Sequence, residues 1–247
     1  MKPTPALRLN GTKHDISYDA TLEFFEGRGR AAQPDAPQVA TMYQDKNLAT
    51  KRDACEKDTV LPLLALRGDE RVLDIGCGCG RWAEALSGRV TSYLGIDFSG
   101  ELLKLAEKHS CPCIRFQRLS AQNVSAATLA VPPPFDLFIC AGILIYLNDS
   151  DVSRIGHSIA QVASPRARVY LREPMAKEER LTLDRFHSAE LETEYSAIYR
   201  TLAQCNEIFG EPLCQAGFRC TLEQTLYPPD LCNRKETEQY IQLWTKL

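Results

Sequence analysis

The sequence of 247 residues lacks the features that would assign it at once to a membrane, nucleic-acid-binding or repeat class. No stretch approaches the roughly twenty consecutive apolar residues of a membrane span, and the start MKPTPALRLN has no apolar signal core, so we expect a cytoplasmic protein. Lysine and arginine number 29 against 32 aspartate and glutamate, a net charge of −3, which gives no electrostatic footprint for nucleic acid or an anionic membrane. There is no internal repeat or low-complexity tract.

Zinc-type cysteine spacing is also lacking, although the chain has ten cysteines. Cys77-Gly-Cys79 and Cys111-Pro-Cys113 are CxC pairs, whereas zinc sites commonly use CxxC or wider spacing. Thiols stay reduced in the cytosol, so disulfides are not expected either. We predict no metal site and interpret the cysteines as small, mostly buried side chains.

The most informative stretch is Arg71–Trp82, RVLDIGCGCGRW. An apolar run is followed by glycines at alternate positions, Gly76, Gly78 and Gly80, and then by an amphipathic segment. This pattern predicts a strand, a tight turn and a helix. Glycine permits positive φ and close approach of the backbone to a ligand, and open α/β sheets bind ligands at the carboxyl ends of their strands.

A dinucleotide would require GxGxxG or GxGxxA directly after the strand. Counted from Gly76, the last position of that motif is Arg81, which does not fit. Counted from Gly78, the motif is completed by Ala83, so NAD remains an alternative at this point.

Asp74 precedes the glycines, and the next apolar strand ends in Asp97. This arrangement resembles motif I and the ribose-binding acid of class I S-adenosylmethionine (SAM) methyltransferases. The resemblance extends over roughly residues 41 to 245 and includes a closing hairpin of two strands near the C-terminus. It implies a three-layer, doubly wound α/β fold, whose mostly parallel seven-stranded sheet has an antiparallel last strand.

The resemblance also implies a cofactor site for SAM, with S-adenosylhomocysteine (SAH) as product. Ser120 stands where the family more often has an acidic residue beside the adenine. The cofactor-binding residues implied are Tyr43, Arg52, Asp74, Gly76, Gly78, Gly80, Asp97, Phe98, Ser120, Ala121, Gln122, Cys140 and Ala141.

Two segments are expected to form the acceptor side. For residues 1–40, which carry an aromatic patch, the resemblance implies a lid over the substrate; the alternative is packing on the outer face of the core. Residues 41–247 are interpreted as the methyltransferase domain. An insertion at about 174–208 has helical periodicity and is predicted to be a helical cap. The substrate-binding candidates are Tyr18, Tyr146, Arg172 and Glu173, and the catalytic candidates are His187, Tyr199 and Arg200.

The resemblance implies an enzyme that transfers a methyl group from SAM to an oxygen or nitrogen of a small molecule, as in specialised natural-product biosynthesis. The sequence does not identify the nucleophilic atom of the acceptor, because no HxD pair, metal triad or Asn-Pro-Pro-Tyr motif occurs. The alternatives are an NAD(P)-dependent oxidoreductase and a non-catalytic SAM-binding regulator. The partners expected are a small-molecule acceptor and, if any protein, a second copy in a homodimer; neither nucleic acid nor membrane is expected.

Overall fold

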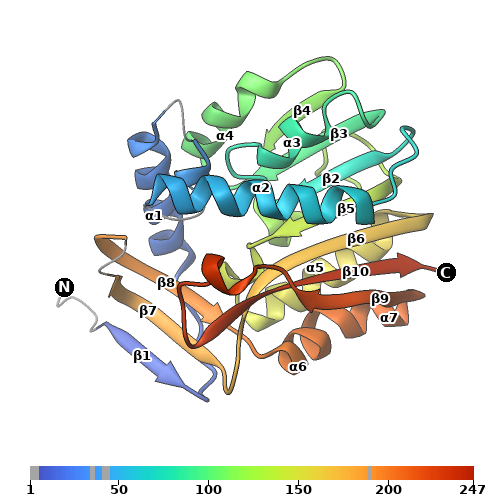
Figure 1. The fold of residues 1–247 in the computed structure, drawn as a ribbon. Coiled ribbons are helices and arrows are strands. Elements are labelled where there is room, and N and C mark those ends of the chain that lie inside the picture. The colour runs from blue at the N-terminus through green and yellow to red at the C-terminus, as the bar shows by residue number, and fades with distance from the viewer. Residues whose placement is uncertain (1–5, 34–36, 41–44, 189–190) are drawn as a thin grey trace.

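A computed structural model describes residues 6–33, 37–40, 45–188 and 191–247, and its main body is a seven-stranded sheet (Figure 1). The strands lie in the order β4 (Ile114–Arg118), β3 (Ser92–Asp97), β2 (Arg71–Ile75), β5 (Phe135–Ala141), β6 (Ala163–Ala176), β10 (Thr237–Lys246) and β9 (Phe218–Thr225). The first five are parallel to one another, whereas β10 is antiparallel to both neighbours. The predicted mostly parallel sheet with an antiparallel last strand is confirmed.

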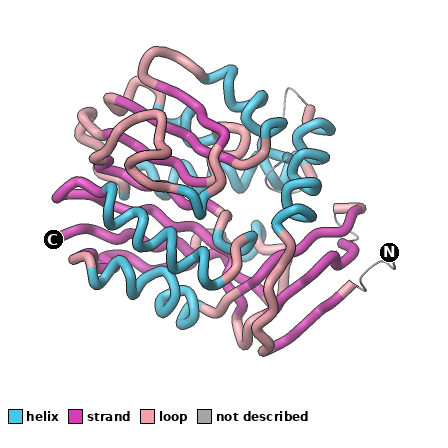
Figure 2. Tube along the Cα trace, turned by 180° about the vertical axis from the view of Figure 1, so that it is seen from behind, coloured by secondary structure: helices cyan, strands magenta, loops and turns pink. Residues whose placement is uncertain are grey.

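Helices cover both faces of this sheet, and Figure 2 shows the rear layer. On one face Trp82 packs in a cluster with Val72, and on the other Ile155 packs in a cluster with Leu73. Neighbouring residues of β2 thus serve opposite faces, as the pleat of a strand requires, and both faces are buried. That double burial explains the near-continuous apolar character of the central strands in the sequence.

The helices of the structure include several single turns. None of the described helices is long and apolar enough to cross a membrane. They are α1 (Tyr18–Ala31), η1 (Pro37–Ala40), α2 (Lys46–Leu63), α3 (Arg81–Leu86), α4 (Gly100–Ala106), η2 (Glu107–His109), η3 (Ala121–Asn123), η4 (Leu144–Tyr146), α5 (Asp149–Val162), α6 (Leu202–Cys205), η5 (Asn206–Gly210), α7 (Glu211–Gln215) and η6 (Pro229–Leu231).

A second, three-stranded sheet forms the cap, at the lower left of Figure 1. It consists of β1 (Leu7–Asn10), β7 (Leu181–Ser188) and β8 (Thr193–Tyr199), paired antiparallel in the order β1-β7-β8. The helical conformation predicted for the insertion at about 174–208 is therefore wrong over β7 and β8. Alternate side chains such as Leu181, Leu183, Tyr195, Ala197 and Tyr199 share one apolar cluster, which is the period of a strand rather than that of a helix.

The N-terminal helix α1 packs beside α4. Ser17 caps it, because the Ser17 hydroxyl accepts a hydrogen bond from the amide of Ala20. A Cβ added to Gly29 would lie 2.7 Å from the Cβ of Glu101, so glycine is what allows the two helices to approach so closely. This contact fixes α1 beside the carboxyl end of β3, from which α4 departs.

Candidate active site

The glycine turn after β2 has the backbone that its sequence predicts. The φ angles of Gly76, Gly78 and Gly80 are +76°, +54° and +79°, a region that other residues rarely adopt. The reason for glycine at position 76 is partly different from the one expected. A Cβ there would meet the Cδ1 atom of Ile143 at 2.3 Å, so this glycine makes room for a neighbouring loop.

Asp97 ends β3 and faces this turn. One carboxylate oxygen accepts the amide hydrogen of Gly78 at 2.9 Å, and the other accepts that of Ser99 at 2.9 Å. Burial raises the pKa of Asp97 to about 6, while these amide hydrogen bonds oppose the shift. Each oxygen keeps a further lone pair, so the ionised carboxylate can accept two more hydrogen bonds.

A cavity of about 220 Å³ lies in front of Asp97, at the carboxyl ends of β2, β3, β4 and β5. Its far wall is α1. Among the residues predicted to bind cofactor, those that line it are Gly76, Gly78, Asp97, Phe98, Ser120, Ala121, Gln122 and Ala141. It is also lined by Tyr18, Asp19, Leu22, Phe25, Leu102, Leu119, Gly142, Ile143, Tyr146 and Leu147. Most of the cofactor-side prediction therefore converges on one cavity.

Other predicted cofactor residues lie elsewhere. Asp74 is 1% exposed and does not line the cavity; the Tyr93 hydroxyl donates to it at 2.5 Å, and burial raises its pKa to about 7. Cys140 is fully buried within β5, and Gly80 is the N-cap residue before α3. The guanidinium of Arg52 donates to the carbonyl of Leu231 rather than facing the cavity. Tyr43 lies outside the described residues.

An aromatic contact closes the cavity beneath α1. The rings of Phe25 and Tyr146 meet edge to face, with centroids 4.8 Å apart and an interplanar angle of 89°. Phe25 also meets Phe98 at 6.0 Å. The sequence has an aromatic patch within residues 1–40, but no pattern in it singles out Phe25 as a residue that lines the cavity.

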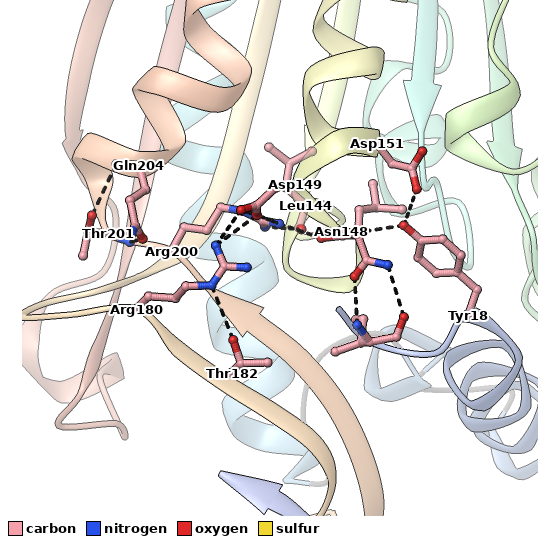
Figure 3. A network of polar contacts seen from close by, with 12 residues as sticks. Tyr18, Leu144, Asn148, Asp149, Asp151, Arg180, Thr182, Arg200, Thr201 and Gln204 are labelled. Atoms are coloured by element: carbon pink, nitrogen blue, oxygen red, sulfur yellow. Dashed lines mark hydrogen bonds and ion pairs between the residues drawn. The ribbon is translucent and has the colours of Figure 1, made fainter. Parts of the chain in front are cut away.

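Tyr18 anchors the start of α1 to the loop before α5 (Figure 3). Its hydroxyl donates to the carboxylate of Asp151 at 2.5 Å and accepts the amide hydrogen of Asn148 at 3.0 Å. The Asn148 side chain in turn bonds both backbone groups of Ile16. Burial raises the pKa of Tyr18, so its hydroxyl stays protonated at neutral pH and serves as an anchor rather than as a base.

Arg200 holds the loop that separates β5 from α5 (Figure 3). Its guanidinium donates to the carbonyls of Leu144 at 2.7 Å and Leu147 at 2.6 Å, and to the carboxylate of Asp149 at 2.8 Å. Arg180 donates to the same carboxylate at 2.9 Å. The structure therefore places Arg200, predicted as a catalytic group, in a loop-holding network and not among the lining of the cavities described here.

A smaller cavity of about 60 Å³ adjoins the first, and Gly142 and Tyr146 line both. It brings together three of the predicted acceptor-side residues, Tyr146, Arg172 and Tyr199. Tyr195, Arg234 and Gln239 also line it, and the sequence gave no pattern that singled out the latter two.

Two further acceptor-side predictions are not in this group. Glu173 points away: one carboxylate oxygen accepts the amide hydrogens of Ile143 at 2.8 Å and Leu144 at 2.7 Å, and burial raises its pKa to about 7. His187 is exposed on β7, opposite Glu194, and lines neither cavity. Among the described residues, no cluster of three or more His, Cys, Asp or Glu is arranged to hold a metal ion.

Comparison with known proteins agrees with this geometry. Residues 72–166, from β2 into β6, match the family model described as "Methyltransferase domain". The chain contains a class I SAM-dependent methyltransferase domain. A solved SAM-dependent methyltransferase from Leishmania major superposes on 92% of the chain and 82% of its own length, with a TM-score of 0.65 and 18% identity. The [4+2]-cyclase SpnF has the same fold, with a TM-score of 0.65 and 15% identity over 95% of this chain and 97% of its own.

Sequence similarity to curated relatives covers only part of the chain. The ubiquinone biosynthesis O-methyltransferase of Thiobacillus denitrificans is 36% identical over 95 residues, which are 37% of this chain and 38% of that protein. The chain thus matches less than half the length of this relative. The match does not extend over both the cap and the N-terminal segment, where the acceptor side is expected.

Proposed function

We propose that the protein transfers a methyl group from SAM to a small molecule, with oxygen favoured over nitrogen as the acceptor atom. The observation that carries the proposal is the Asp97 carboxylate, buried at the end of β3 yet lining the cavity. The preference for oxygen rests on the names of the curated relatives, which are mainly ubiquinone biosynthesis O-methyltransferases. A role in specialised metabolism stays part of the proposal.

The residues present fit SAM. The two open lone pairs of the Asp97 carboxylate suit a ribose diol, which offers two hydroxyl donors. Leu102 and Leu119 give the same cavity apolar walls suited to an adenine, and Ser120 and Gln122 give it polar groups. When bound, SAM supplies an activated methyl group on a sulfonium. The chain itself has to hold the acceptor atom in line with that methyl and exclude water.

We infer that α1 is the water-excluding lid of residues 1–40. Tyr18, Leu22 and Phe25 line the cavity from the side opposite the glycine turn. The hydrogen bonds of Tyr18 to Asp151 and Asn148 hold the closed position. We further propose that residues 41–247 form the catalytic domain and that residues 174–208 contribute its acceptor-side cap.

The fold alone leaves other activities open, since the cyclase SpnF shares it. The experiment that tests the proposal therefore has two readouts. Calorimetry should show micromolar binding of SAM and no binding of NAD, and SAH should accumulate when hydroxylated and aminated small molecules are supplied with SAM. Binding of NAD instead of SAM would revive the oxidoreductase alternative. SAM binding without SAH formation over a broad acceptor panel would favour the non-catalytic alternative.

A further inference from the structure

The small cavity beside the cofactor cavity has a volume of about 60 Å³, and much of its lining consists of cationic and hydrogen-bonding side chains. Its polar lining comes from three parts of the chain. These are β6 with Arg172, β8 with Tyr195 and Tyr199, and the region of β10, where Arg234 precedes the strand and Gln239 lies on it. Strands from the main sheet and from the cap therefore meet at this point.

Arg172 is the central group of the cavity. The residue is 8% exposed, and its Nε atom faces the carboxylate of Glu56 at 3.4 Å. Its two terminal nitrogens make no hydrogen bond to any of the described residues. A Cβ added to Gly142 would lie 2.8 Å from Nη1, which shows that the guanidinium lies against one of the two residues that line both cavities.

Arg172 shares its partner, Glu56. The Glu56 carboxylate also accepts a hydrogen bond from Arg81 at 3.1 Å and another from the Tyr170 hydroxyl at 2.9 Å, while Arg81 pairs with Asp53 as well. The electrostatic attraction of Glu56 outweighs burial and raises the pKa of Arg172, which stays charged. A charged guanidinium end that lines a cavity and has no partner in the protein can donate hydrogen bonds to an anion placed there.

The rest of the lining is also polar and partly unsatisfied. The amide oxygen of Gln239 is buried and has no hydrogen-bond partner within the described part of the chain. The hydroxyls of Tyr195 and Tyr199 are 3.2 Å apart, and Arg234 donates to Tyr195 at 3.3 Å. A ligand here would thus meet a second cation and an acceptor for one of its own hydroxyl or amine hydrogens.

We propose that this cavity binds an oxyanion of the methyl acceptor, a carboxylate or a phosphate, through the terminal nitrogens of Arg172. The inference rests on the proposed function, since it names the class of acceptor for that same site. A guanidinium end with two parallel donors matches the two oxygens of such a group. The volume suffices only for the charged group, so the remainder of the acceptor extends past Gly142 and Tyr146 toward the cofactor cavity.

Direct binding by the full chain tests this proposal. The probes are glycolate, inorganic phosphate and the neutral glycolamide, titrated by calorimetry into protein saturated with SAH. Glycolate or phosphate should bind with a dissociation constant at or below the millimolar range, and glycolamide should not. The relative affinities of glycolate and phosphate show whether the cavity prefers a carboxylate or a phosphate.

Three variants sharpen the test. Arg172→Gln should weaken the anion at least tenfold. Gln239→Glu, nearly isosteric, should do the same by charge repulsion and keeps the test usable if Arg172→Gln does not fold. The matched control is Arg166→Gln, an exposed arginine near the other end of β6, which should leave the affinity unchanged.

The outcomes distinguish this inference from the proposed function. The oxyanion site would be overturned if the anions bound no better than glycolamide, or if they bound Gln239→Glu as tightly as the wild type. If SAH still bound in these experiments, the proposed methyltransferase function would stand. Failure of SAH to bind would count against the proposed function instead. In the acceptor panel, SAH formation should be confined to anionic compounds and lost for their matched amides; turnover of the amides at equal rates would refute the inference.

Discussion

Asp97→Asn is the substitution that most directly tests the cofactor site. In the wild type, the two carboxylate oxygens accept the amides of Gly78 and Ser99, each at 2.9 Å. An asparagine keeps one acceptor oxygen and replaces the other with an NH₂ donor, so the site loses the negative charge and one acceptor for a ribose hydroxyl. Hydrogen bonds to a charged group contribute about 1.5–3 kcal/mol, which corresponds to a roughly 10- to 150-fold weaker SAM affinity.

The pH dependence gives the same substitution a second signature. Burial raises the pKa of Asp97 to about 6, and only the ionised form accepts two ribose hydroxyls. Wild-type affinity for SAM should therefore be constant above pH 6 and fall about tenfold per pH unit below it. Asp97→Asn removes the titrating group, so its weaker affinity should show no step there. The charges of Asp74 and Glu26 also raise the pKa of Asp97, so they contribute to the pH at which SAM affinity begins to fall.

The assay is calorimetric titration of SAM and of SAH between pH 5 and 7, with circular dichroism to confirm folding at each pH. Asp69→Asn, on an exposed side chain, is the matched control and should behave as the wild type. An unchanged dissociation constant in Asp97→Asn would refute the placement of the ribose at β3. A wild-type affinity that is flat through pH 6 would refute the role of the ionised carboxylate.

Three other substitutions test the surroundings of the site. Burial raises the pKa of Asp74 to about 7, so the contribution of this group to stability is present below pH 4 and is lost as pH rises through 7. Asp74→Asn should therefore raise the free energy of unfolding at pH 8 by at least about 1 kcal/mol. The control Asp69→Asn should not raise it. Tyr18→Phe removes the hydrogen bond to Asp151 and should cost about 1 kcal/mol in denaturant unfolding; SAM affinity should fall by a few fold, and an unchanged affinity would argue against the lid. Arg200→Ala should lower stability by about 3 kcal/mol, with turnover and thermal stability lost together; turnover lost from a fully stable variant would return Arg200 to a direct catalytic role.

The cofactor half could be predicted because its signals are local. Strand β2, the glycine turn and α3 are contiguous in sequence, and Asp97 is marked by its place at the end of an apolar strand. Parallel strands bring their carboxyl ends to one edge, so Ser120 and Ala141 follow without knowledge of side-chain contacts. Asp74 shows the limit of a motif. Its position beside the glycines is as expected, but its side chain is buried against Tyr93.

The acceptor half could not be predicted because its contacts are distant in sequence. Leu7 of β1 pairs with Asp184 of β7, and no local pattern encodes such a pairing. The same holds for the small cavity, where Arg172, Tyr199 and Gln239 meet only after β6, β8 and β10 are in place. Arg172 is among the residues predicted from the sequence to bind the substrate, but the position of its guanidinium depends on Glu56 from α2 and on a glycine at position 142. The proposed acceptor site is therefore built where the cap meets the main sheet, from strands that are far apart in the sequence.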